Sequence, residues 1–335
     1  MERIQYRVKM TLFMCYYYSI EIILNIKAKS ESKNQFIIKL SLWLPIIILR
    51  WIMSGVYEKT IGKIVARRFR KNDINRNFKY ELGIVAIAKD EGQYIKEWVK
   101  YHKVVGVDKI YLYDNGSSDN TKSEIDDYVK SGFIKWIPFP GSVMQIPAYN
   151  DAIKKYSNEC RYMAFIDLDE FIVPTKRELL VDTIRRIIKR NLYAGGIGVN
   201  WALFGSSGYE KQQEKPITQT FFRRADETAW PNFHVKTICN PRVVKNYISP
   251  HFPVYKLGFI NIAPNGKRQY VWGNRYVDYS EIRCHHYFCK SKEEWIIKRS
   301  RGMADRNQVY NMEKFNEYDI NDVFDDIMIR YSDCL

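Results

Sequence analysis

Residues 82–88 read LGIVAIA, a short apolar run typical of a strand buried on both faces of a parallel sheet. After this run, large side chains recur at helical spacing until Gly106, which is where a helix would end. Further strands are expected over residues 109–113 and 133–137, separated by a helix that begins at a capping-box spacing, Thr121 and Glu124. Alternating strands and helices of these lengths predict an α/β fold with a mostly parallel sheet flanked by helices.

Ligands of such sheets bind beyond the carboxyl ends of the strands. The loops at residues 89–91 and 114–119 follow the first two expected strands and are therefore candidate site loops.

Residues 162–173 read YMAFIDLDEFIV, which we interpret as one apolar strand with acidic residues in its middle. In an extended chain Asp167 and Asp169 lie on the same face. Two nearby carboxylates repel each other, and a divalent cation such as Mg²⁺ or Mn²⁺ relieves that repulsion. The alternative is a polar loop whose acids lie in water.

The histidines offer a further ligand. His286 is a candidate to join the two aspartates on one metal, whereas His102 is expected to be a core residue of its helix. A zinc site built from Cys284, His285, His286 and Cys289 is the alternative, although this spacing matches no closed zinc motif. Ser291 and Glu294 again have capping-box spacing, which predicts a helix whose start could bind an anion.

Five motifs together resemble a known group. They are AIAKDEGQYIKEWVKYHKVVGVDKIYLYDNGSSDNT (86–121), QIPAYNDAI (145–153), FIDLDEFIVP (165–174), HVKTICNPR (234–242) and HYFCKSKEEWIIKRSRG (286–302). In this order they resemble the nucleotide-sugar glycosyltransferases of the GT-A fold, nearest to the family 2-like and family 92 groups. The resemblance covers roughly residues 82–305 and implies a Rossmann-like sheet.

Roles for individual residues follow from the resemblance. It implies that the nucleotide-sugar donor is contacted by Lys89, Asp90, Glu91, Asp114, Gln145, Tyr149, Asn150, Asp167, Lys236, Arg242 and Lys298. Within this set, Lys236, Arg242 and Lys298 would contact the diphosphate. Asp167, Asp169 and His286 would hold Mn²⁺ or Mg²⁺, with Asp169 the more direct ligand.

Many family 2 enzymes carry a pair of acidic residues as the catalytic base, and here the chain departs from their pattern. Asp226 and Glu227 are the nearest candidates, with surface salt bridges to their neighbouring arginines as the alternative. Trp201, Phe204 and Trp230 are candidates to stack on sugar faces, with plain core packing as the alternative.

The basic charge of the chain gathers at its beginning. Of 335 residues, 53 are Lys or Arg and 38 are Asp or Glu, but residues 1–80 alone hold 16 basic and only 5 acidic residues. The same segment has apolar stretches at 12–26 and 36–56, and their charge-free parts are too short to cross a bilayer straight. We therefore expect residues 1–80 to be a helical, membrane-interfacial segment and 81–335 the glycosyltransferase domain. Packing of this segment on the domain or on a second copy of the chain stays open; binding to nucleic acid is not expected.

Together these observations predict a metal-dependent transferase that moves a sugar from a nucleotide diphosphate, UDP by the resemblance, to a glycan or lipid-linked acceptor. Inversion at the anomeric carbon and a role in cell-surface polysaccharide synthesis are implied by the resemblance alone. A nucleotidyltransferase and a non-catalytic scaffold are the alternatives. Six cysteines form no disulfide framework, and nucleotide sugars are made in the cytosol, so the expected location is the cytoplasmic face of a membrane.

Overall fold

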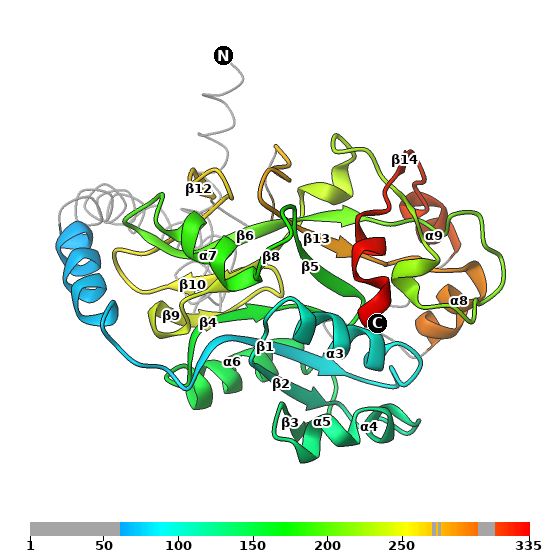
Figure 1. Ribbon diagram of the computed structural model, residues 1–335, viewed down its shortest axis with the longest axis horizontal. Helices are drawn as coiled ribbons and strands as arrows, with labels where there is room; N and C mark the ends of the chain where they lie inside the picture. Colours follow the sequence, from blue (N-terminus) through cyan, green and yellow to red (C-terminus); the bar gives the residue numbers. More distant parts are fainter. Residues whose placement is uncertain (1–60, 270–272, 274–275, 301–311) are drawn as a thin grey trace, which may run out of the picture. The chain divides into compact units, whose positions relative to one another are not determined.

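The computed structural model describes residues 61–269, 273, 276–300 and 312–335 (Figure 1). The chain divides into two compact units, residues 1–73 and 74–335. Residues 61–73 of the first unit are helical. The apolar stretches 12–26 and 36–56 lie outside the described residues. No helix in the described ranges is long and apolar enough to span a membrane.

The second unit begins with alternating strands and helices, as the sequence predicts. They are β1 (Tyr80–Ala88), α3 (Ile95–Val104), β2 (Lys109–Asp114), α4 (Thr121–Glu124), α5 (Asp126–Lys130), β3 (Ile134–Pro138), α6 (Gln145–Tyr156) and β4 (Cys160–Phe165). Strand β1 pairs in parallel with β2 and β4, and β2 pairs in parallel with β3. Gly106 follows α3 with a φ of 91°, a left-handed conformation that ends the helix.

The sheet continues beyond β4 with strands of both directions. These are β5 (Glu170–Pro174), β6 (Ala194–Leu203), β8 (Val235–Cys239), β11 (Ile260–Ile262), β12 (Arg268–Gln269) and β13 (Ile282–His286). The strand order is β12-β11-β6-β8-β4-β1-β2-β3, and β13 pairs with β5 and β6. Strand β8 runs antiparallel between β4 and β6. The predicted α/β fold with a mostly parallel sheet is therefore confirmed, although the sheet is mixed.

The other elements surround this sheet. They are α7 (Leu180–Ile188), α8 (Lys292–Ser300), α9 (Met312–Tyr318), the two-stranded pairs β9 (Val244–Tyr247) with β10 (Pro253–Tyr255) and β7 (Arg223–Arg224) with β14 (Val323–Phe324), and short 3₁₀ segments at Ile217–Gln219, Trp230–Phe233, Pro241–Val243 and Ile327–Cys334.

Both faces of the sheet are covered, because successive side chains of a strand point to opposite faces. Leu82, Ile84 and Ala86 of β1 pack in one cluster with residues of α3 and α7, and this cluster includes the fully buried Trp98. Val85 of the same strand packs on the other face, in a cluster with residues of α6. The alternation of β1 thus explains why helices cover the sheet on two sides.

Two local predictions are wrong. Thr121 does not cap one continuous helix: Asn120 occupies the N-cap position without a side-chain cap, and the segment forms two short helices, α4 and α5. Residues 162–173 do not form one strand either, because β4 ends at Phe165 and β5 begins at Glu170. The acids therefore lie in a turn rather than in an extended chain.

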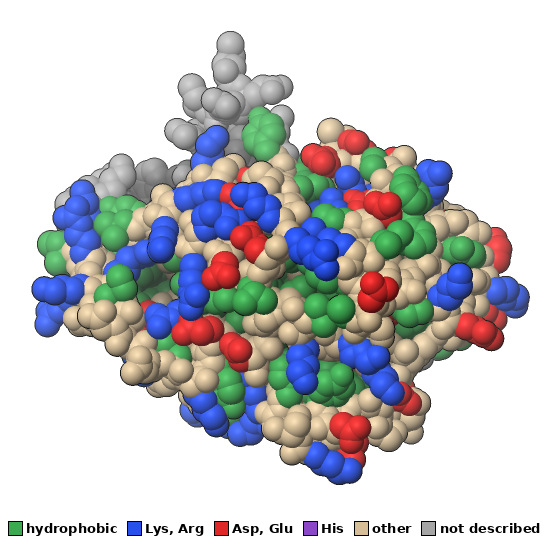
Figure 2. Space-filling view, in the orientation of Figure 1, with side chains coloured by type: hydrophobic (Ala, Val, Ile, Leu, Met, Phe, Trp, Pro, Cys, Tyr) green, Lys and Arg blue, Asp and Glu red, His purple; other side chains and the backbone are tan. Residues whose placement is uncertain are grey.

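Acidic and basic side chains are interspersed on the face of the molecule in Figure 2. Arginines of α7 illustrate this pairing: Arg185 binds Glu81 at 2.6 Å, and Arg186 binds Glu178 at 2.6 Å and Glu281 at 2.5 Å. The pair of Arg185 with Glu81 is largely exposed and contributes at most about 1 kcal/mol, whereas Glu281 is buried and its carboxylate is compensated by Arg186.

Candidate nucleotide-sugar site

The acidic turn between β4 and β5 is the centre of the candidate site. The backbone N–H of Glu170 donates to the carbonyl of Asp167 at 3.2 Å, which closes the turn. Glu170 then opens β5 and pairs with His286 at the end of β13. Two strands that are far apart in sequence therefore bring an imidazole next to the acids.

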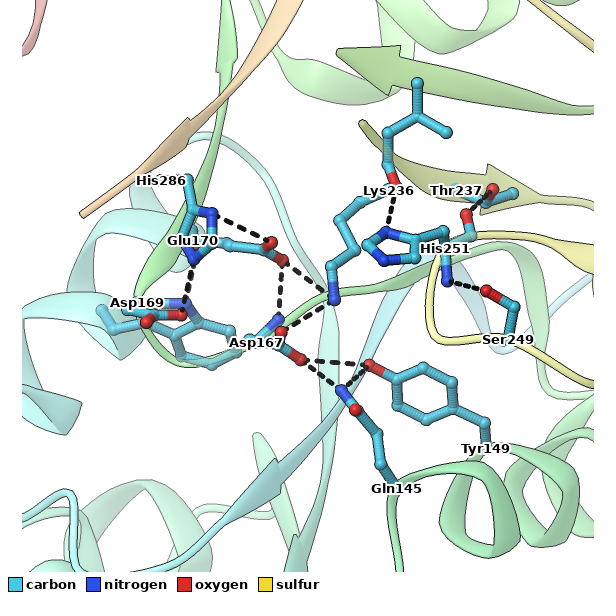
Figure 3. A network of polar contacts seen from close by, with 12 residues as sticks. Gln145, Tyr149, Asp167, Asp169, Glu170, Lys236, Thr237, Ser249, His251 and His286 are labelled. Carbon is cyan, nitrogen blue, oxygen red and sulfur yellow. Dashed lines mark hydrogen bonds and ion pairs between the residues drawn. The ribbon is translucent and has the colours of Figure 1, made fainter. Parts of the chain in front are cut away.

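Asp167 is surrounded by donors from two elements (Figure 3). Its Oδ2 lies 2.8 Å from Nζ of Lys236 on β8, and its Oδ1 accepts from Nε2 of Gln145 on α6 at 2.5 Å. The hydroxyl of Tyr149, one turn further along α6, lies 3.4 Å from the same oxygen. The structure thus joins four residues that the resemblance places at the donor site.

Asp169 is buried and faces Lys298 and His286. Its Oδ2 lies 2.5 Å from Nζ of Lys298, and its Oδ1 lies 3.5 Å from Nε2 of His286. Burial alone would raise the pKa of Asp169, but Lys298 and His286 hold the pKa well below its usual value. Asp169 is therefore an anion at neutral pH.

The predicted capping box before α8 is confirmed, and it positions Lys298. The hydroxyl of Ser291 donates to the Glu294 carboxylate at 2.6 Å, and the Glu294 N–H donates back to that hydroxyl at 3.3 Å. This reciprocal pair defines where α8 begins, and therefore the side on which Lys298 projects.

Glu170 is a member of the site whose role the sequence interpretation missed. It is fully buried, with Oε2 3.4 Å from Nζ of Lys236. Burial raises the pKa of Glu170 to about 7, although Lys236 opposes this shift. Its Oε1 and Nδ1 of His286 are 4.0 Å apart, and neither atom has a hydrogen-bond partner in the described part of the chain.

The side chains of the acidic turn include donor types that could bind a metal, but positive charges lie opposite them. Among the described residues, no three His, Cys, Asp or Glu side chains are arranged to hold a metal ion. The two aspartates have lysine ammonium groups opposite them instead. Carboxylate oxygen and imidazole nitrogen are nevertheless donors that Mn²⁺ accepts, and Nδ1 of His286 is unpartnered. The donor types therefore fit a divalent cation, which would have to displace Lys298 from Asp169.

The loops that follow β1 and β2 are bound to each other. Asp90, at a φ of 52°, accepts from the N–H of Ser118 at 2.7 Å, and the Glu91 N–H donates to the hydroxyl of Thr121 at 2.8 Å. Asp114 ends β2 and accepts from the N–H of Ser117 at 3.0 Å. Lys89 is exposed. These residues lie at the carboxyl ends of two parallel strands, as the sequence analysis expects.

Two residues assigned to the donor have structural contacts instead. Both ends of the Asn150 amide pair with the backbone of Tyr247, at 2.9 and 2.7 Å. The Arg242 guanidinium donates to the carbonyl of Cys160 at 2.7 Å, at the start of β4. Asp167 follows the other end of that strand, roughly 20 Å away at 3.3 Å per residue. In this structure the Arg242 side chain thus contacts the start of β4, and its contact with the diphosphate stays a prediction.

The candidate bases lie on the exposed segment after β7. The Asp226 carboxylate accepts from the N–H and the hydroxyl of Thr228, at 2.9 and 2.7 Å, and these donors hold the pKa of Asp226 below its usual value. Glu227 is exposed and lies 3.9 Å from Arg224. A lowered pKa makes a carboxylate a weaker base, so this geometry does not favour Asp226.

Lys290 is another buried cation near the site that the sequence interpretation missed. Its ammonium lies 3.8 Å from the centre of the Tyr94 ring, and burial lowers its pKa. Lys290 directly precedes the capping residue Ser291. Its place within the motif at residues 286–302 is the sequence feature that could have indicated a role.

Residues 85–327 match the family described as Glycosyltransferase family 92. This chain belongs to glycosyltransferase family 92. A family 92 protein of Ricinus communis is 28% identical over 141 residues, which are 42% of this chain and 25% of that protein. A family 92 protein of Oryza sativa subsp. japonica is 25% identical over 174 residues, 51% of this chain and 29% of that protein. The chain thus spans little more than a quarter of the length of these curated family 92 relatives.

Among solved structures, the chain is similar to S. aureus TarS in complex with UDP, with a TM-score of 0.33 and 16% identity over 49% of this chain and 47% of TarS. It is also similar to glucosyl-3-phosphoglycerate synthase from Mycobacterium tuberculosis in complex with Mn²⁺, UDP and glucosyl-3-phosphoglycerate, with a TM-score of 0.27 and 17% identity over 36% and 44% of the two chains. Likeness at this level does not establish a shared fold.

Proposed function

We propose that this family 92 chain is a GT-A glycosyltransferase that moves a sugar from a UDP-sugar donor to a glycan or lipid-linked acceptor, with inversion. The single observation that supports this most is the acidic turn after β4, where Asp167 and Asp169 each face a lysine beside the imidazole of His286. A non-catalytic scaffold would have no need to bury so many compensated charges in one place.

The residues of the turn suit a diphosphate leaving group. As the bond between the anomeric carbon and the diphosphate breaks, negative charge develops on the phosphate oxygens. Lys236 is held by Asp167, so its ammonium group is already oriented when the charge develops. Gln145 and Tyr149 support the Asp167 carboxylate from α6.

A divalent cation, Mn²⁺ or Mg²⁺, would be held by Asp169 and His286 together with Asp167. When bound, it supplies further positive charge to the leaving diphosphate. Lys298, displaced from Asp169, would then be released towards the same phosphates.

The three aromatic candidates for stacking on an acceptor sugar differ in how exposed they are. Trp201 is buried and its ring centre lies 4.3 Å from that of His286, so it is a packing residue. Phe204 is buried as well, whereas Trp230 is 43% exposed. Of the three aromatic candidates, Trp230 is therefore the one suited to stack on an acceptor sugar.

A thermal-shift screen of nucleotides, each with and without Mn²⁺, tests the proposed function. UDP should raise the melting temperature of the full chain, and Mn²⁺ should increase that shift, because a ligand that binds only the folded state stabilises it. A preference for nucleoside triphosphates would indicate a nucleotidyltransferase instead. No shift with any nucleotide would support a scaffold.

We also propose that the protein works at the cytoplasmic face of a membrane, in cell-surface polysaccharide synthesis. The helix at residues 61–73 carries exposed Ile61, Ile64 and Val65 together with exposed Lys63, Arg67, Arg68 and Lys71. Apolar and basic side chains on one helix suit anionic lipid headgroups. Deletion of residues 1–75 should move the protein from the membrane to the soluble fraction; retention at the membrane would contradict this proposal.

A further inference from the structure

His251 lies beside the candidate site without any role assigned to it so far. In Figure 3 its imidazole lies next to the Lys236 side chain, whose ammonium binds Asp167. Its backbone is tied down on both sides, because its N–H donates to the Ser249 hydroxyl at 3.2 Å and its carbonyl accepts from the Thr237 hydroxyl at 2.7 Å. The residue is therefore held against β8 at the level of Lys236.

The hydrogen bonds of the ring determine which nitrogen carries the proton. Nδ1 lies 3.1 Å from the carbonyl oxygen of Val235. A carbonyl can only accept, so in the neutral ring Nδ1 carries the hydrogen and Nε2 has the free electron pair. Within the described part of the chain, nothing donates to Nε2, and the side chain is partly exposed.

Neighbouring rings set the orientation of this imidazole. Trp201 contacts it edge-on with ring centres 5.4 Å apart, and His234 packs on it at 5.3 Å. The same Trp201 ring lies 4.3 Å from the candidate metal ligand His286. The Trp201 ring therefore packs against both His251 and His286.

The surroundings of the ring also set its charge state. Burial lowers the pKa of His251 well below its usual value, and Lys236 and His234 add to this shift. The ring is therefore neutral at physiological pH. The bond from Nδ1 to Val235 leaves the electron pair on Nε2, while the lowered pKa makes this ring a weaker base than a free imidazole.

We propose that Nε2 of His251 is the general base of the transfer reaction, in place of Asp226 or Glu227. This rests on the proposed glycosyltransferase function. The proton of the acceptor hydroxyl passes to Nε2 while the hydroxyl oxygen forms a bond to the anomeric carbon. The bond from that carbon to the diphosphate breaks, and its electron pair leaves with the nucleoside diphosphate. The imidazolium then returns its proton to water.

Release of UDP from UDP-glucose, UDP-galactose and UDP-N-acetylglucosamine in the presence of Mn²⁺ tests this role, with water as the nucleophile. His251→Gln in the full chain should lower kcat by about 100-fold or more, since general bases contribute at least that much. The KM for the donor and the Kd for UDP should stay within about twofold, because a base acts on the transition state only. His251→Gly should recover turnover when free imidazole is added, which a merely structural role would not allow.

The outcomes separate the two proposals. If kcat is unchanged in His251→Gln, His251 is not the base, while the transferase function still stands. The same holds if the His251 variants lose UDP binding and imidazole does not restore turnover of His251→Gly. The role is also overturned if Asp226→Asn or His234→Gln abolishes turnover while His251→Gln retains it. A wild-type protein that binds no UDP and releases none from any of the three donors contradicts the proposed function itself.

Discussion

Lys236 and Asp167 are 69 positions apart in the chain, yet their side chains meet at 2.8 Å where the antiparallel strand β8 lies beside the end of β4. The same ammonium lies 3.4 Å from the fully buried Glu170. One lysine thus compensates two carboxylates, so the site depends on it for stability as well as for charge.

Lys236→Met should destabilise the protein by about 3 kcal/mol, because it leaves a carboxylate buried without its cation. Chemical denaturation measures this loss. Lys245→Met on β9, the next strand along the chain, is the matched control: Lys245 is exposed, and its loss should change stability by no more than about 0.5 kcal/mol. Equal stability of the two variants would show that Lys236 does not compensate buried charge.

His102 should make the protein sensitive to acid. It is fully buried in α3, and burial lowers its pKa from 6.5 to about 3. Between these values the unfolded chain binds a proton that the folded chain does not, so stability is complete above pH 6.5 and falls as the pH drops towards 3.

His102→Leu should therefore reduce the dependence of stability on pH, by about 1.4 kcal/mol per pH unit within that range. At pH 8 the substitution removes one hydrogen bond, from Nδ1 to the Trp98 carbonyl at 2.9 Å, and should cost about 1 kcal/mol, since Nε2 has no partner within the described ranges. Urea denaturation of both proteins at pH 8 and pH 5 is the measurement. An identical pH dependence in the variant would mean that His102 does not carry the effect.

Arg242→Lys should lower stability and leave UDP binding intact. The guanidinium holds the carbonyls of Cys160 at 2.7 Å and Arg161 at 3.2 Å, and an ammonium cannot reproduce this planar arrangement of donors. We expect a loss of about 1–3 kcal/mol from the unpaired carbonyls. A large loss of UDP affinity without a loss of stability would instead support the contact of Arg242 with the diphosphate.

Much of the fold could be predicted because the spacing of apolar residues along the chain indicates which side chains are buried. The run at 82–88 alternates between two packed faces, and it became β1 as expected. The capping box at Ser291 formed because both partners face each other within one turn. Thr121 has the same spacing to Glu124, but its hydroxyl accepts from Glu91 on a neighbouring loop instead. A tertiary contact therefore overrides a local signal that the sequence cannot rank.

The sequence indicated which residues form the site, but not which side chains contact one another there. Motif order indicated Asp167, Asp169 and His286, yet the lysines opposite the aspartates come from β8 and α8. The place of β8 beside β4 rests on an antiparallel pairing that motif order does not indicate. Glu170 and His251 were missed for a related reason. Glu170 continues an acidic run, and only the break between β4 and β5 buries it. His251 is brought to the site by contacts with β8.

Calorimetric titration of UDP into the full chain with Mn²⁺, compared with Asp169→Asn, addresses the donor site most directly. Asp182→Asn on α7 serves as the control, because its side chain is 52% exposed. We predict that wild type and the control bind UDP alike, and that Asp169→Asn loses at least about tenfold in affinity together with the effect of Mn²⁺. Equal, metal-enhanced binding by Asp169→Asn would contradict the assignment of the acidic turn as the donor site.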